Sequence, residues 1–338
     1  MSKVGVVIFL ILFAVACKNK KIPNVSNIKV DLTLQRFEKD FFSIDTTNVD
    51  QSLLQLNKKY PGFLQDFVFN ILGLPSQPDS AAAVQRGLTK FIGSYRPVKN
   101  DADEIFGSMD QVQKEVKKGL QFVKHYFPAY RLPNKVITFI GPINSYGNII
   151  TADALAVGLQ LYMGSNYLLY QSEAGQVLYP AYISRRFKPE YIPVNCIKNI
   201  VDDMYPDNSA GRPLIEQMVE AGKRLYLLDR LMPETADTLK TGYTQNQLEG
   251  SLKNEEFIWS FFVQNDLLFV SDPALTKDYM NEAPNTAALG QASPGSIGQF
   301  VGWRIVQKWM DKNEKVTMAQ LMETNAKKIF SEAKYRPR

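Results

Sequence analysis

Two short segments near the middle of the chain have the hydrophobic pattern of β-strands. Residues 136–140 form a nearly unbroken apolar run, rich in β-branched side chains and bounded by Pro133 and Gly141; this is typical of a strand buried on both faces. Residues 154–161 alternate instead, with large apolar side chains on one face and mostly small ones on the other. The turn-forming residues between the two segments predict that they pair as a hairpin.

Most of the remaining chain has the three-to-four-residue periodicity of amphipathic helices. The pattern predicts helices over residues 48–60, 61–72, 79–95, 110–127, 189–204, 214–231, 254–262 and 317–330. A further strand is predicted over 29–36, and a loop over 271–289. The expected fold class is α+β and predominantly α-helical, with a small β-sheet packed by helices. We expect residues 28–338 to form a single folded domain.

The stretch that begins at Ser293 and reaches Trp303 is rich in glycine. Ser293 is suited to cap a helix and Pro294 to occupy its first position. Gly295, Gly298 and Gly302 then fall on one helix face, although each interior glycine costs about 0.5–1 kcal/mol relative to alanine. Close approach of another backbone is the favoured explanation. An anion bound at the helix N-terminus is the alternative, but neither GxxxxGK[ST] nor GxGxxG is present.

The N-terminus has the pattern of a targeting segment. Lys3 precedes a run, residues 4–15, that is almost wholly apolar and too short for the roughly 20 residues of a spanning helix. Small residues directly precede Cys17, an arrangement that resembles the bacterial lipobox, with Ala14 where leucine is usual. We therefore predict a lipoprotein signal peptide over 1–16, lipidation of Cys17 and a polar tether over 17–27. An ordinary signal peptide with an incidental cysteine is the alternative.

The residue types that catalysis usually requires are scarce. His125 is the one histidine, so the chain cannot supply HExxH or a multi-histidine zinc site. Cys196 lies within a helical pattern beside apolar residues, which favours inert packing. The acidic pairs Asp202-Asp203 and Glu255-Glu256 diverge on a helix. We therefore predict no catalytic, cofactor or metal-binding residue. The net charge of +5 is spread along the chain, which argues against a nucleic-acid partner.

Several segments, in order along the chain, resemble the gliding-motility lipoprotein B family of Bacteroidetes. Besides the lipobox they are RFEKDFF (36–42), YPGFLQDFVFNILGL (60–74), GLQLYMGSNYLLY (158–170), YPAYISRRFKPEYI (179–192), SPGSIGQFVGWRIVQKWMDKN (293–313) and the terminal KYRPR. The family more often has Asp where Gln160 stands and Arg where Ser296 stands. The motif positions singled out, with no role assigned, are Tyr179, Pro180, Ser293, Pro294, Gly295, Gly298, Gly302 and Trp303.

The resemblance implies a membrane-anchored, non-catalytic accessory of gliding motility and of the associated type IX secretion apparatus, with machinery proteins as partners. The family is also remotely similar to predicted zinc peptidases with HExxH on a helix, which implies a degenerate zincin-like scaffold. The helix around 194–204 is the natural place for the lost motif, and it carries Cys196, Lys198, Asn199 and the Asp202-Asp203 pair. Residues 18–21 lack the acidic residues that mark export to the cell surface in Bacteroidetes, and this absence resembles a periplasm-facing lipoprotein. A periplasmic hydrolase of peptide or cell wall and a lipid- or anion-binding module remain alternatives.

Overall fold

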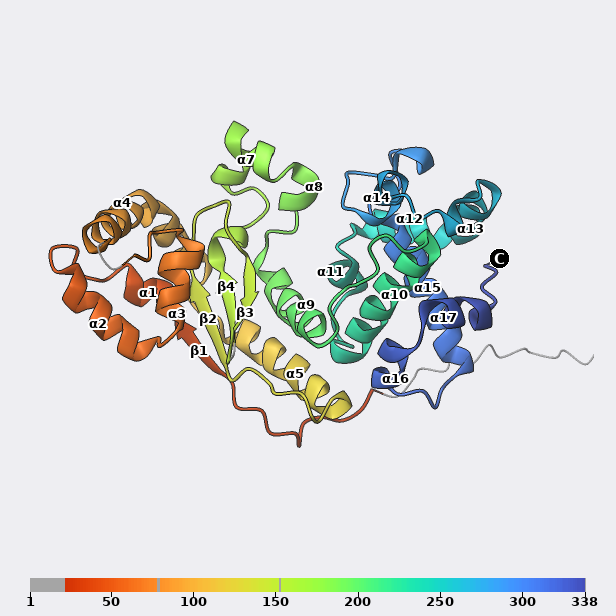
Figure 1. Ribbon diagram of the computed structural model, residues 1–338, viewed down its shortest axis with the longest axis horizontal. Helices are drawn as coiled ribbons and strands as arrows, with labels where there is room; N and C mark the ends of the chain where they lie inside the picture. Colours follow the sequence, from red (N-terminus) through yellow and green to blue (C-terminus); the bar gives the residue numbers. More distant parts are fainter. Residues whose placement is uncertain (1–21, 78–79, 152, 338) are drawn as a thin grey trace, which may run out of the picture.

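The computed structural model describes residues 22–77, 80–151 and 153–337, and a four-stranded mixed sheet lies at its centre. The signal peptide and Cys17 lie outside the described residues. The strands are β1 (Thr33–Arg36), β2 (Lys135–Phe139), β3 (Asn148–Ile150) and β4 (Ala154–Gly158), in the order β1-β2-β4-β3. β1, β2 and β4 run parallel, whereas β3 is an antiparallel edge strand (Figure 1).

The predicted hairpin between residues 136–140 and 154–161 is wrong. β2 and β4 are parallel neighbours, with Val136 opposite Leu155. The segment between them does not simply turn, because it contains β3, which pairs with β4. The second predicted strand also stops at Gly158, and residues 159–161 form the 3-10 turn η2. The sheet is therefore one strand larger than the sequence pattern indicates.

Helices make up most of the chain, which confirms an α+β fold that is predominantly helical. The first half of the chain, up to residue 204, contains the sheet. Its helices are α1 (Phe37–Phe41), α2 (Val49–Lys59), α3 (Phe63–Gln65), the π-helical turn η1 (Asp66–Ile71), α4 (Ala81–Ile105), α5 (Asp110–Tyr126), η2 (Leu159–Leu161), α6 (Leu168–Gln171), α7 (Glu173–Leu178), α8 (Ala181–Ser184), η3 (Pro189–Tyr191) and α9 (Ile192–Met204). None of the helices within the described ranges has the length and apolar character needed to cross a membrane.

The second half of the chain is entirely helical in its regular elements and lies beside the first (Figure 1). It comprises α10 (Leu214–Leu231), α11 (Asp237–Thr241), α12 (Gln245–Lys253), α13 (Glu255–Gln264), η4 (Leu267–Phe269), α14 (Pro273–Met280), η5 (Ala287–Leu289), α15 (Ile297–Lys312), α16 (Met318–Glu323) and α17 (Ala326–Ala333). The predicted loop over 271–289 is wrong, because Asp272 caps α14 by accepting from the backbone N–H of Ala274 and Pro273 occupies its first turn.

Different elements cover the two faces of the sheet. On one face, the rings of Phe63 and Phe67 lie 5.9 and 6.1 Å from the ring of Phe139 on β2, so α3 and η1 pack there. On the other face lies α9, where Cys196 Sγ is 3.8 Å from Asn148 Nδ2 on β3. Since a strand points alternate side chains to opposite faces, β3 is flanked by η1 on one side and α9 on the other.

The helical half is built around the contact of α10 with α15, which approach backbone to backbone. A Cβ atom added to Gly302 would lie 1.6 Å from the carbonyl oxygen of Met218, and one added to Gly222 would lie 2.1 Å from the carbonyl carbon of Gly302. A Cβ on Gly298 would lie 2.4 Å from Met280 Sδ. Close backbone approach is therefore the physical reason for glycine on this face of α15.

The predicted start of this helix is wrong by three residues. α15 begins at Ile297, after Ser296 in the left-handed conformation (φ 54°). Ser293 instead closes the preceding loop, because its hydroxyl bonds the backbone of Thr286 and Gly290. The backbone of Gly295 passes so close to Ala283 that an added Cβ would lie 2.2 Å from its carbonyl oxygen. The loop that carries Ala283 thus packs against the residues just before Ile297, where the sequence pattern predicts the first turn of the helix.

Candidate functional site

The polar face of α9 is the most distinctive polar feature near the sheet. Asn195, Lys198, Asn199 and Asp202 follow the spacing of one helix face, so they form a single stripe, which we call the α9 polar stripe. This is the helix on which the remote resemblance to zinc peptidases would place a lost metal motif. The stripe runs beside β3, and Asn148 of that strand lines a hollow on each side of it.

A buried hydrogen-bonded cluster holds the centre of this region. The hydroxyl of Tyr162 contacts Asn148 Oδ1 and accepts from Asn195 Nδ2 at 2.8 Å. Burial raises the pKa of Tyr162, so the phenol stays protonated and can donate to Asn148. Cys196 is fully buried, and burial raises the pKa of its thiol to about 12. Since the thiolate is the reactive form, Cys196 packs as an inert side chain, as the sequence predicted.

On one side of the α9 polar stripe lies a hollow whose lining includes two cationic side chains, Arg186 and Lys198. This hollow, of about 270 Å³, is lined by Asn148, Tyr162, Arg186, Asn195 and Lys198, among others. Arg186 makes a bidentate ion pair with Glu282, with Nη1–Oε1 and Nη2–Oε2 distances of 2.6 and 2.5 Å. No hydrogen bond or ion pair to Lys198 is present among the residues that the structure covers. Burial, reinforced by the neighbouring guanidinium of Arg186, lowers the pKa of Lys198 to about 8.

The lowered pKa gives Lys198 a measurable signature. Its amine should become a nucleophile near pH 8, because the charged form is disfavoured there. We expect acetylation by a water-soluble acylating reagent, followed by peptide mass spectrometry, to reach half its maximal rate near pH 8. The exposed Lys253 is the internal reference. Arg186→Gln should move the Lys198 midpoint to higher pH; a Lys198 profile that coincides with that of Lys253 would contradict this assignment.

The acidic groove on the other side of the stripe follows the free edge of β3. We call it the β3 groove. Its volume is about 730 Å³. The lining residues are Phe63, Asp66, Asn70, Ile71, Tyr146, Asn148, Ile149, Ile150, Thr151, Asn199, Asp202 and Asp203. The two adjacent aspartates diverge, as predicted: Asp202 pairs with Arg224 at 2.7 Å, and Asp203 accepts from the hydroxyl of Tyr130 at 2.6 Å.

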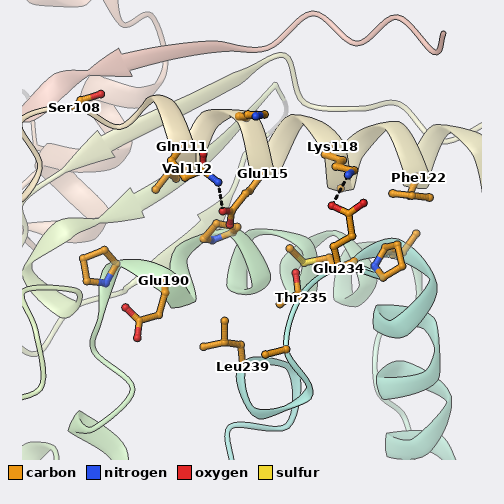
Figure 2. A pocket seen from close by; sticks show the side chains of 18 residues that line it. Ser108, Gln111, Val112, Glu115, Lys118, Phe122, Glu190, Glu234, Thr235 and Leu239 are labelled. Carbon is orange, nitrogen blue, oxygen red and sulfur yellow. Dashed lines mark hydrogen bonds and ion pairs between the residues drawn. The ribbon is translucent and has the colours of Figure 1, made fainter. Parts of the chain in front are cut away.

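A third hollow, of about 700 Å³, lies between α5 and the connection from α10 to α11 (Figure 2). Figure 2 shows two pairs among its polar side chains: Lys118 bonds Glu234 across the hollow, and Gln111 bonds Glu115 along α5. The first of these pairs joins the sheet-containing half to the helical half. The arrangement is that of a seam between two packed parts of the chain, with Lys118 and Glu234 paired across it.

The motif positions occupy two separate places. Tyr179 donates its hydroxyl to the carbonyl of Ile143 at 3.0 Å, and Pro180 directly precedes α8. Both therefore stand beside the loop that follows β2. The other six belong to α15 or the segment before it. Trp303, on α15, donates its indole N–H to Asp229 Oδ2 on α10 at 2.7 Å. Of these eight positions, only Gly295 lines the small hollow that also contains Arg185 and Arg186, so the two sets stay apart.

The start of α15 offers little room for a ligand. The hollow beside it has a volume of about 20 Å³, on the order of the space that one water molecule needs. A phosphate or carboxylate at this helix N-terminus would have to displace the surrounding side chains.

Gln160 stands where the family more often has aspartate, and its side chain is fully buried. Its amide oxygen accepts from the backbone N–H of Gly141 at 3.0 Å, and its amide nitrogen donates to the carbonyl of Tyr146 at 3.1 Å. An aspartate could reproduce the first bond but not the second, because a carboxylate has no N–H to donate. Gln160 therefore ties both ends of the loop that leads into β3.

The sequence analysis does not predict several residues that the structure brings into this region. The Ile149-Ile150 pair has the β-branched character of a strand, and this was the available signal for β3. Arg186, Glu282 and Asp66 carry no local signal, since their positions depend on contacts between distant segments. Within the described ranges, no three His, Cys, Asp or Glu side chains are grouped as metal ligands. The zincin-like scaffold stays a prediction.

Comparison with known proteins gives one match. The family model described as gliding motility protein GldB matches residues 18–337, nearly the whole chain. No curated protein and no solved structure matches the chain.

Proposed function

The chain belongs to the GldB family of gliding-motility lipoproteins, and from this premise we propose that it is a lipid-anchored, non-catalytic accessory of gliding motility. It serves the gliding machinery and the associated type IX secretion apparatus by holding protein partners in the cell envelope. The observation that carries this proposal is the family match, which begins directly after Cys17 and continues to residue 337.

The chemistry of the α9 region is consistent with a holding role. Asp202 and Asp203 are engaged by Arg224 and Tyr130, whereas a general acid–base pair needs carboxylates that converge on a substrate. Cys196 is buried with a raised pKa, which disfavours nucleophilic catalysis. The open groove and exposed strand edge beside these residues are features that a binding protein uses.

The membrane side of the proposal rests on the N-terminus. A cysteine that carries several acyl chains gains about 0.8 kcal/mol of membrane affinity per buried CH₂. Such a cysteine would hold the folded part at the membrane through the tether of residues 17–27, which begins with a basic segment. The protein would then face the periplasm, where its partners in the machinery are within reach.

Deletion and complementation in the source bacterium test this function. We expect deletion to abolish spreading on a surface and to retain type IX cargo inside the cell. Asp66→Asn, Asp202→Asn and Asp203→Asn, each as a single substitution, should restore most of the spreading, because none acts as a proton carrier. A single variant that is present at normal level and still binds its partners but cannot spread would overturn the non-catalytic part. So would turnover of a peptide or cell-wall library by the purified protein.

A further inference from the structure

The outer edge of β3 has backbone groups without partners. In the β3–β4 ladder, Gly158 donates to Gly147 and Thr151 donates to Ala154, each at 2.8 Å. Because antiparallel partners alternate between bonded and non-bonded pairs, this register turns the N–H and C=O groups of Asn148 and Ile150 outward. No hydrogen bond from either N–H occurs among the described residues. The sheet therefore ends in two donors and two acceptors that another strand could use.

The space beside this edge continues the plane of the sheet. One wall of the β3 groove comes from α3 and η1, which supply Phe63, Asp66 and Ile71, and the other comes from α9. These elements cover opposite faces of the sheet. A chain lying between them would occupy the position of a fifth strand, about 4.8 Å from β3. The groove volume of about 730 Å³ accommodates a short peptide.

Apart from its short length of three residues, the strand lacks the devices with which proteins usually protect an edge. Natural edge strands carry lysine, proline or a bulge that prevents pairing with another chain. The β3 sequence, Asn148 to Ile150, has two isoleucines, no charge and no proline. Its side chains are only partly buried. An apolar strand edge that is left open inside a groove is a site for strand addition.

The walls define what kind of segment fits. Phe63 and Ile71 lie on the face to which Ile149 also points, so alternate side chains of an added strand would meet an apolar wall there. Side chains of the other face would meet Asp202 and Asp203 on α9. Asp66 adds a third carboxylate, and no lysine or arginine is among the lining residues. The groove thus favours an extended segment with apolar and basic side chains in alternation.

The geometry points to the β3 groove as the docking site for an extended basic segment of a partner protein, which pairs with β3 as a fifth strand. This inference rests on the proposed function, since it identifies the kind of partner that the accessory holds. Main-chain hydrogen bonds to Asn148 and Ile150 supply affinity whatever the sequence of the partner's segment. The apolar wall supplies the preference for apolar residues, and Asp66 and Asp203 supply that for basic residues, since Arg224 already pairs with Asp202.

A peptide-binding measurement on the full chain, purified from membranes in detergent, tests this inference. The probe is a fluorescent octapeptide of alternating valine and lysine, followed by fluorescence polarisation; the matched control peptide has glutamate for each lysine. We expect the lysine peptide to bind at least tenfold more tightly than the glutamate peptide. The difference should shrink at high salt, because the aspartates are solvent-accessible.

Ile150→Pro removes one outward N–H while leaving the bonds to β4 in place, which is where proline is tolerated in a sheet. It should weaken binding of the lysine peptide at least tenfold, with an unchanged thermal unfolding midpoint as the folding control. The double variant Asp66→Lys, Asp203→Lys leaves the edge intact and should reverse the preference in favour of the glutamate peptide. Equal binding of both peptides, or full binding by Ile150→Pro, would overturn the inference. So would a chain that dimerises through this edge and excludes the peptide.

The same experiment separates this inference from the proposed function. If the lysine peptide does not bind while deletion still abolishes spreading and cargo export, the docking inference alone fails. If mass spectrometry shows the peptide cleaved after incubation, the non-catalytic role fails, although the groove does take a peptide.

Discussion

Gly302→Ala is expected to destabilise the protein by roughly 3 kcal/mol, at the upper end of the usual cost of overpacking a core. The added methyl group would lie 1.6 Å from the carbonyl oxygen of Met218, an atom of the α10 backbone that no rotamer change can move. The two helices must therefore separate, and the buried side chains around their contact lose packing. A thermal unfolding midpoint lowered by roughly 4–5 °C, measured by circular dichroism, would be the result.

Gly93→Ala is the matched control for this substitution. Gly93 is exposed on α4, and an added Cβ would meet nothing within 4 Å. The same chemical change should there stabilise the protein by about 0.4–1 kcal/mol, because alanine loses less conformational entropy on folding. Similar midpoints for the two variants would mean that the contact of α10 with α15 adjusts far more easily than its geometry indicates.

Cys17→Ser should eliminate the membrane anchor. Without the thiol no acyl chain can be attached, and the affinity of about 0.8 kcal/mol per buried CH₂ is lost. In cells grown with a clickable fatty acid, we expect labelling of the protein to fall to background. Surface spreading should fall with it.

Cys196→Ser supplies the control for the anchor, because Cys196 is the other cysteine of the chain. It lies buried beside the amide of Asn148, which can donate to a serine hydroxyl. This variant should keep full fatty-acid labelling. Labelling that survives Cys17→Ser, or that is lost in Cys196→Ser, would show that Cys17 is not the lipidated residue.

Local patterns in the sequence predict the helices well where the apolar stripe is long. The helices predicted over 110–127 and 214–231 correspond to α5 and α10, and the capping box of Thr317 is formed as predicted. The helix after this cap is interrupted at Thr324, since α17 begins separately after Asn325. Local signals fix helix existence and caps because both depend on neighbours a few residues away.

Pairing across the chain is what the sequence could not supply. The order of β2, β4 and β3 depends on contacts that no local periodicity encodes, so the local pattern predicts a hairpin where the strands are parallel. Gly302 could be recognised as a close contact, but its partners Met218 and Gly222 could not. For the candidate site, the sequence indicates α9 and its polar residues. It does not indicate Asp66 or the edge of β3, because only the tertiary fold brings them next to α9.

The parallel arrangement of the sheet also governs how the chain can acquire its structure. Leu34 on β1 pairs with Val136 on β2, which is 102 positions later. Bringing such distant segments together costs loop-closure entropy before any contact compensates for it, and such topologies fold slowly. During synthesis, β1 therefore waits without its partner until β2 has been made, and β2 and β4 pair later still. The first 130 or so residues depend, over that interval, on their helices and on the aromatic contacts of α1 with α3 and η1.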